Sequence, residues 1–208
     1  MSRTAPVSLP TVRDEVAALK RRRTIDAAVD LFYENGYENA TLDAVADRLG
    51  VSKPFIYANF GSKAELLAEI CLSGVVTSHQ AIDGVLALGL GPEQSLEHFA
   101  QRYVTAVLEQ QKRIAVYVRE EKNLDPMDAG RIGALRREFF GKLTRLLEEG
   151  ADAGVFDVDD CQIAALAIGG AVTWSTFWYR PDGRLSVGEI ADQMTRSVQN
   201  LAGVRRNS

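Results

Sequence analysis

The chain has 208 residues, of which 46% are hydrophobic and 25% are charged. This balance excludes wholesale disorder and collagen-like sequence, and the length suffices for one or two domains with a sizeable core. The net charge of −4 argues against non-specific nucleic-acid binding by the chain as a whole. Two cysteines are too few for a disulfide framework, so we expect reduced thiols, no structural zinc and a cytoplasmic location.

Charge is distributed unevenly along the chain. Residues 1–25 carry six basic and two acidic residues, a local charge of +4, whereas residues 64–208 carry a charge of −5. A basic end on an acidic body predicts a small basic module joined to a larger domain with another task.

Four helices are predicted in the first part of the chain. Residues 1–17 mix Ser, Thr and Pro without apolar periodicity, and we interpret them as a flexible arm. From Ala18 the apolar spacing becomes helical, and Gly36 predicts the end of this first helix. A second, very short helix follows Thr41 and ends at Gly50.

The next two helices have clear start signals. Ser52 can cap a third short helix, which contains Pro54 in its first turn and ends at Gly61. The sequence Ser62-Lys63-Ala64-Glu65 is a capping box and predicts a fourth helix over about residues 63–79.

Five longer helical patterns follow, separated by Gly- and Pro-containing turns. They cover residues 93–111, 113–123, 129–152, 159–179 and 186–202. The predicted fold is therefore all-α, with about nine helices and no strand. The segment between Asp160 and Arg180 is uncharged and long enough to span a membrane. However, Gln162 and the hydroxyl residues of this segment favour a helix at a domain centre or dimer interface.

The turn Gly50-Val51-Ser52 joins two short helices into a helix-turn-helix, whose second helix is a candidate for the DNA major groove. A plain helical hairpin is the alternative interpretation. The basic approach to the first helix, and a hydroxyl or lysine at each helix start, fit phosphate binding and favour the DNA-binding interpretation.

The segment TLDAVADRLGVSKPFIYANFGSKAELL, preceded by LFYENGYENATL, resembles the DNA-binding domain of the TetR family of bacterial transcriptional regulators. The resemblance implies an all-helical homodimer. Its N-terminal domain, residues 18–62, would bind a palindromic DNA operator. Its C-terminal bundle, residues 63–208, would bind an effector and pair the two subunits.

The resemblance also implies which side chains contact DNA. They are Thr41, Ser52, Lys53, Pro54, Phe55, Tyr57, Asn59 and Lys63. Phe55 departs from common family usage, because a small or hydroxyl residue is frequent there. Phe55 either packs in the core or contacts a thymine methyl group, so the sequence does not specify which DNA bases are recognised. From the basic run 20–23 we add Arg22, although a solvated helix start is the alternative.

A second segment, TWSTFWYRPDGRLSVGEI, resembles the closing helices of TetR-type repressors of lipid and steroid breakdown, whose effectors are often coenzyme A thioesters. Aromatic side chains at helical spacing could line an acyl pocket, although core packing is the more frequent role of any single one. The candidate ligand-binding residues are Phe99, Tyr103, Tyr117, Arg119, Phe139, Trp174 and Trp178. A basic entrance for the phosphates could come from Arg102, Lys112, Arg113 and Arg119.

The sequence thus predicts a repressor of lipid catabolism that a fatty-acyl or related coenzyme A thioester releases from its operator. A TetR-type repressor of an efflux or detoxification gene, responding to a free hydrophobic or aromatic compound, is the alternative, and an activator remains open. We find no Gly-rich phosphate loop, metal-ligand set or nucleophilic triad, and therefore predict no enzyme activity and no cofactor. The expected partners are operator DNA, a hydrophobic effector and a second copy of the chain, and no membrane.

Overall fold

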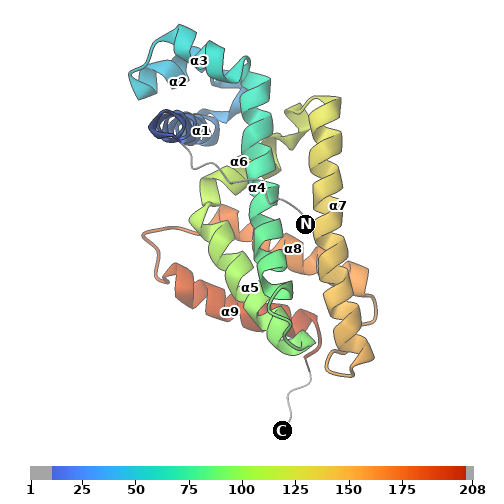
Figure 1. The fold of residues 1–208 in the computed structure, drawn as a ribbon. Coiled ribbons are helices and arrows are strands. Elements are labelled where there is room, and N and C mark those ends of the chain that lie inside the picture. Colours follow the sequence, from blue (N-terminus) through green and yellow to red (C-terminus); the bar gives the residue numbers. More distant parts are fainter. Residues whose placement is uncertain (1–10, 205–208) are drawn as a thin grey trace, which may run out of the picture. The chain divides into compact units, whose positions relative to one another are not determined.

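The computed structural model describes residues 11–204 and shows an all-helical chain in this range (Figure 1). The described residues form nine α-helices and one 3-10 helix, with no strand among them. The helices are α1 (Val12–Asn39), α2 (Leu42–Leu49), α3 (Lys53–Phe60), α4 (Lys63–Leu86), α5 (Pro92–Glu109), α6 (Gln111–Glu120), α7 (Pro126–Asp152), α8 (Cys161–Trp178) and α9 (Val187–Leu201). The 3-10 helix η1 (Glu121–Asn123) follows α6. The predicted fold class is confirmed.

Most predicted helix starts and ends lie within about three residues of the observed ones, and two differ by more. Helix α1 begins at Val12, inside the expected flexible arm, because the Thr11 hydroxyl accepts from the Asp14 amide and the Asp14 carboxylate accepts from the Thr11 backbone. The first ten residues of that arm lie outside the described residues. Gly36 interrupts α1 with φ 76° and ψ 159° as expected, and α4 extends beyond the predicted end to Leu86.

The chain divides into two compact units, with the boundary after Leu66 inside helix α4. In the first unit, helices α1, α2 and α3 enclose a small core in which Phe32, Val45 and Ile56 are fully buried. Because each short helix buries only one face here, its opposite face stays in solvent.

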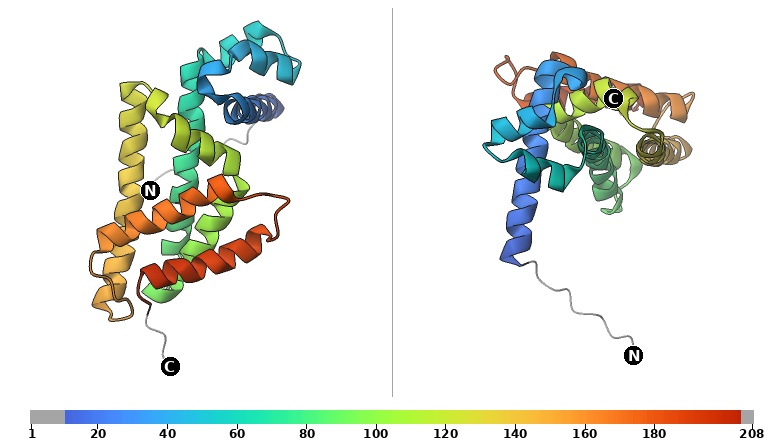
Figure 2. Two further views of the ribbon diagram at one scale, coloured as in Figure 1. Left: turned by 180° about the vertical axis from the view of Figure 1, so that it is seen from behind. Right: turned by 90° about the horizontal axis from the view of Figure 1, so that it is seen from above.

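The second unit has a larger core built by helices that are far apart in sequence. Helix α9 packs along α5, and α8 packs on α7, as both views show (Figures 1 and 2). Phe99 and Tyr103 of α5 stack with a ring separation of 5.2 Å, and Phe139 of α7 lies 5.3 Å from the Tyr103 ring. This aromatic cluster joins two helices across the middle of the unit.

Helix α8 contains the long uncharged segment of the sequence. One face of α8 is buried at Ala165, Ile168 and Val172, which belong to the core of the second unit. Within residues 11–204, no helix is both long and apolar enough to cross a membrane.

Candidate functional site

The turn of the helix-turn-helix depends on a glycine. Gly50 ends α2 with φ 65° and ψ 33°, a left-handed conformation that other residues adopt at a cost. Its amide and that of Val51 both donate to the Ala46 carbonyl, which closes the end of α2. The chain is thereby turned directly into Ser52 and the start of α3.

Helix α3 presents polar side chains from its first turn. Ser52, Lys53 and Tyr57 are all exposed, and Tyr57 keeps 51% of its surface accessible. The Ser52 hydroxyl makes no capping bond to its own helix. Lys53 Nζ lies 2.6 Å from Asp43 Oδ2 of α2, and this contact raises the pKa of Lys53, which therefore stays charged.

The other predicted DNA-contacting residues are either exposed or partly buried. Arg22, Thr41, Pro54 and Asn59 are exposed. Thr41 caps α2 by accepting from the Ala44 amide at 3.1 Å.

Phe55 and Lys63 are only partly exposed. The Phe55 ring lies 5.6 Å from Lys20 Nζ, so it packs in part against α1. Lys63 Nζ donates to the Tyr37 carbonyl at 2.9 Å and lies 4.2 Å from the Tyr37 ring. Two of the exposed residues also have internal partners: Lys53 pairs with Asp43, and Asn59 Nδ2 donates to the Phe55 carbonyl at 2.7 Å. To contact DNA, Lys53 and Lys63 must exchange these partners for DNA atoms.

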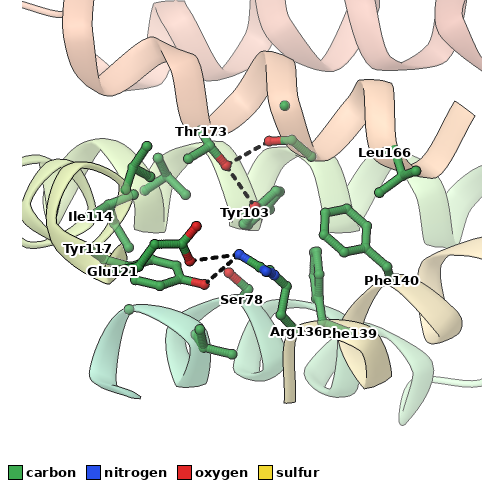
Figure 3. A pocket seen from close by; sticks show the side chains of 16 residues that line it. Ser78, Tyr103, Ile114, Tyr117, Glu121, Arg136, Phe139, Phe140, Leu166 and Thr173 are labelled. Carbon is green, nitrogen blue, oxygen red and sulfur yellow. Dashed lines mark hydrogen bonds and ion pairs between the residues drawn. The ribbon is translucent and has the colours of Figure 1, made fainter. Parts of the chain in front are cut away.

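The second unit encloses a cavity of about 270 Å³ (Figure 3). Helices α4 to α8 and the 3-10 helix η1 all contribute to its wall, which is mostly apolar. The lining residues are Gly74, Val75, Ser78, Tyr103, Val107, Ile114, Tyr117, Val118, Glu121, Arg136, Phe139, Phe140, Leu166, Gly169, Gly170 and Thr173. An apolar hollow with a few polar groups is the usual form of a small-molecule site.

One polar cluster stands in this wall. Arg136 Nη1 lies 2.7 Å from Glu121 Oε2 and 3.4 Å from the Tyr117 hydroxyl (Figure 3). Burial raises the pKa of Tyr117 to about 12, so its hydroxyl keeps its proton at neutral pH. The cluster therefore offers hydrogen-bond donors to a ligand, and its single carboxylate is already paired with a guanidinium.

A glycine allows α7 and α8 to approach closely beside the cavity. A Cβ atom at Gly169 would lie 2.5 Å from Phe140 Cε1 and 2.7 Å from Phe140 Cζ. Phe140 consequently rests on the α8 backbone and forms part of the cavity wall.

The structure brings only some of the predicted ligand-binding residues together. Tyr103, Tyr117 and Phe139 line the cavity, each from a different helix. Phe99 does not line it, because it is fully buried in the core, stacked on the Tyr103 ring.

Three other predicted ligand-binding residues lie outside this cavity. Trp174 and Trp178 lie on the outer face of α8 with 63% and 48% of their surfaces exposed. Arg119 is exposed at the end of α6 and does not line the cavity. Nor do the expected entrance residues Arg102, Lys112 and Arg113.

Sequence reasoning missed Arg136, whose only sequence signal is its place one turn before Phe140 on a long amphipathic helix. Glu121 and Phe140 are recognisable in the sequence as a polar and an aromatic residue beside apolar helix faces, but the sequence does not show their contacts. Within the described range, no group of three or more His, Cys, Asp and Glu side chains could hold a metal ion.

Comparisons with known proteins give a consistent assignment. Residues 25–70 match the family described as "Bacterial regulatory proteins, tetR family", and residues 89–202 match the "Tetracyclin repressor-like, C-terminal domain". The transcriptional repressor KstR2 of Mycolicibacterium smegmatis is 22% identical over 192 residues, which covers 91% of this chain and 93% of KstR2.

Two solved structures extend the match. The TetR family regulator PfmR of Thermus thermophilus is 30% identical with a TM-score of 0.79, and the match covers 88% of this chain and all of PfmR. AibR, solved in complex with isovaleryl coenzyme A and operator DNA, is 23% identical with a TM-score of 0.78. That match covers 89% of this chain and all of AibR, and at this identity it supports the fold alone.

Proposed function

We propose, from the premise that this chain belongs to the TetR family of bacterial transcriptional regulators, that it is a repressor released from its operator by a coenzyme A thioester. The observation that carries the DNA-binding half is the start of α3. There Ser52, Lys53 and Tyr57 project into solvent directly after a left-handed glycine turn. This is how a recognition helix presents its N-terminal residues to base edges and phosphates.

A palindromic operator requires two copies of the chain, and the outer face of α8 supports self-association. Ile163, Trp174 and Trp178 expose between 48% and 65% of their surfaces on this one helix. Large apolar side chains gathered on one surface are typical of an interaction site. In the proposed homodimer the two α3 helices reach successive major grooves, about 34–36 Å apart.

The effector half rests on the cavity of the second unit. Its apolar wall suits an acyl chain, and Arg136 and the Tyr117 hydroxyl suit the polar carbonyl of a thioester. The complex of AibR with isovaleryl coenzyme A and operator DNA gives a precedent on the same fold. We propose that the genes released from repression by such a thioester are genes of lipid catabolism.

A free hydrophobic or aromatic compound is the second candidate effector, as in a repressor of an efflux or detoxification gene. An aromatic cation would need a carboxylate among aromatic rings. Glu121 is the carboxylate of the cavity wall, but it is neutralised by Arg136 at 2.7 Å. This pairing favours a neutral or anionic effector over a cation.

Helix α4 is the proposed transmitting element. Its first turn carries Lys63, and its middle carries Gly74, Val75 and Ser78 of the cavity wall. A ligand that changes the position of this helix would change the spacing of the two recognition helices. Release requires different ligand affinities of the two states, and a coupling free energy of about 1–3 kcal/mol is typical.

Substitutions in α3 test the proposed recognition helix. We expect Lys53→Ala or Tyr57→Ala to lower operator affinity by about ten- to a hundredfold, because each removes an exposed DNA-contacting side chain. Fluorescence anisotropy with DNA from immediately upstream of the gene measures this. Sedimentation should give the same dimer, and calorimetry the same thioester affinity.

The matched control is Arg196→Ala, which removes an exposed positive charge from α9 and should leave operator affinity within about twofold. Equal losses in Arg196→Ala and Lys53→Ala would contradict the assignment of α3. Loss of dimerisation in Lys53→Ala or Tyr57→Ala would contradict the division of tasks between the two units.

A further inference from the structure

A second hollow adjoins the cavity on the surface of α7 and α8. Its lining residues are Arg136, Arg137, Phe140, Gly141, Thr144, Arg145, Glu148, Gln162 and Leu166. We call it the arginine groove. Arg136, Phe140 and Leu166 line both the groove and the cavity. The cavity and a hollow that carries several arginines therefore share the same wall.

The arginine groove is basic where the cavity is apolar. Arg137 and Arg145 are both exposed, and Gly141 lies midway between them on the same helix face. A Cβ atom at Gly141 would meet nothing within 4 Å, so the space between the two arginines is open. Thr144 and Gln162 add hydrogen-bonding groups, and Glu148 adds one carboxylate. Arg136 is paired with Glu121, which leaves two arginines against one carboxylate.

We infer that the arginine groove binds the phosphates of the coenzyme A moiety while the acyl chain occupies the cavity, with the thioester beside Arg136. This inference rests on the effector proposed above and assigns its polar half to specific residues. It also replaces the entrance expected from Arg102, Lys112, Arg113 and Arg119, which do not line the cavity or the groove.

The chemistry of the groove fits this ligand. Guanidinium groups bind phosphate oxygens through paired, charge-assisted hydrogen bonds. Arg137 and Arg145 are eight residues apart on α7, which corresponds to roughly 12 Å along the helix axis. The Arg137 guanidinium lies back toward Gly133, where an added Cβ atom would be 3.5 Å from Arg137 Nη1, so it stays apart from Arg145. Two separate guanidinium groups suit a ligand with two phosphate sites, as coenzyme A has in its pyrophosphate and its ribose phosphate. A free fatty acid has one carboxylate and would engage one arginine at most, and an uncharged aromatic compound would form an ion pair with neither.

The experiment compares two thioesters with the same acyl chain by isothermal titration calorimetry on the full-length protein. A panel of acetyl-, octanoyl- and palmitoyl-coenzyme A first identifies the acyl chain that binds most tightly. The matching N-acetylcysteamine thioester then serves as a ligand without phosphates. We expect Arg137→Ala and Arg145→Ala each to weaken the coenzyme A thioester by about tenfold and to leave the truncated thioester within about twofold.

Three further variants keep the result interpretable. Arg131→Ala removes an exposed arginine from α7 outside the arginine groove and should change neither affinity. Gly141→Leu fills the open space without meeting a neighbouring atom at Cβ, and should weaken only the coenzyme A thioester. Glu148→Gln removes the one carboxylate of the groove and should strengthen binding of the coenzyme A thioester by about two- to threefold.

The outcomes separate this inference from the proposed function. Selective loss for the coenzyme A thioester in Arg137→Ala and Arg145→Ala supports the arginine groove as the phosphate site. Tight thioester binding that these variants leave unchanged, or that Arg131→Ala weakens equally, overturns the groove and keeps the effector. Absence of binding by every thioester of the panel overturns the proposed effector, and the groove with it.

Discussion

The two units present their candidate sites in opposite ways. In the first unit, the exposed residues Ser52, Lys53 and Tyr57 come from one short segment and need only a glycine turn and a small core to be presented. In the second unit, the cavity wall is assembled from five α-helices and η1, between Gly74 and Thr173. The proposed recognition surface, formed by Ser52, Lys53 and Tyr57, depends only on local structure. The cavity, in contrast, requires packing between segments that are distant in sequence.

This difference predicts how each unit responds to substitution. Loss of one side chain from the recognition surface should remove a contact with DNA and leave the fold intact. Loss of one side chain from the cavity wall should change the packing of several helices at once. Trp174 and Trp178 are the only tryptophans of the chain, and both lie in α8, so tryptophan fluorescence reports on the second unit, including any dimer formed through α8.

The largest expected effect is in the aromatic cluster of the second unit. Phe139 is 3% exposed, and its ring lies 5.1 Å from that of Phe140 and 5.3 Å from that of Tyr103. We expect Phe139→Ala to lower the free energy of unfolding by about 3–5 kcal/mol, because it leaves a hole in the core. Denaturant titration followed by tryptophan fluorescence measures this. Met127→Ala, at an exposed site on the same helix, should stay within about 0.5 kcal/mol.

An intermediate effect is expected where α7 and α8 meet. Gly169→Ala should destabilise the second unit by about 1–3 kcal/mol, because its Cβ atom would overlap the Phe140 ring. Gly130→Ala places a Cβ atom in open space on α7 and should be neutral or stabilising by up to about 1 kcal/mol. If Gly169→Ala and Gly130→Ala both lowered the midpoint of the tryptophan transition, the close contact of α8 with Phe140 at Gly169 would not explain the loss.

The smallest effect is expected in the first unit. Gly50→Ala forces a residue with a Cβ atom into φ 65°, at a cost of about 1 kcal/mol or somewhat more. Gly50→Asn should lose less, because Asn tolerates this conformation better. We expect Gly50→Ala to lower the melting temperature seen by circular dichroism and to weaken operator binding. The tryptophan fluorescence transition, which comes from the second unit, should not move. A tryptophan transition that moved as far as the dichroism would contradict a local role for Gly50.

The local signals made the first unit predictable from sequence. Gly36, Gly50 and Gly61 were expected to end helices, and all three adopt positive φ. Ser62 caps α4 as expected, since its hydroxyl accepts from the Glu65 amide at 3.1 Å and donates to the Glu65 carboxylate at 3.3 Å. The start of α1 at Val12 was missed because its cap, formed by Thr11 and Asp14, follows a segment without apolar spacing.

The cavity was only partly predictable, because helical periodicity does not say which neighbour a helix face meets. Trp174 and Trp178 share a face, as their spacing requires, but that face points outward, while Gly169 and Thr173 face the cavity. Arg136 is an ordinary charged residue in the sequence. Its contact with Tyr117 and Glu121 arises only when α7 packs beside α6 and η1.

Release of operator DNA by a ligand in the cavity is tested most simply by one anisotropy titration of the wild-type protein on DNA from immediately upstream of its gene. It is run at two salt concentrations and repeated with the coenzyme A thioester that binds most tightly. We predict tight binding that weakens steeply with salt and is reversed by the thioester. Operator binding that persists when the thioester is bound would contradict the proposed coupling between the cavity and the recognition helix.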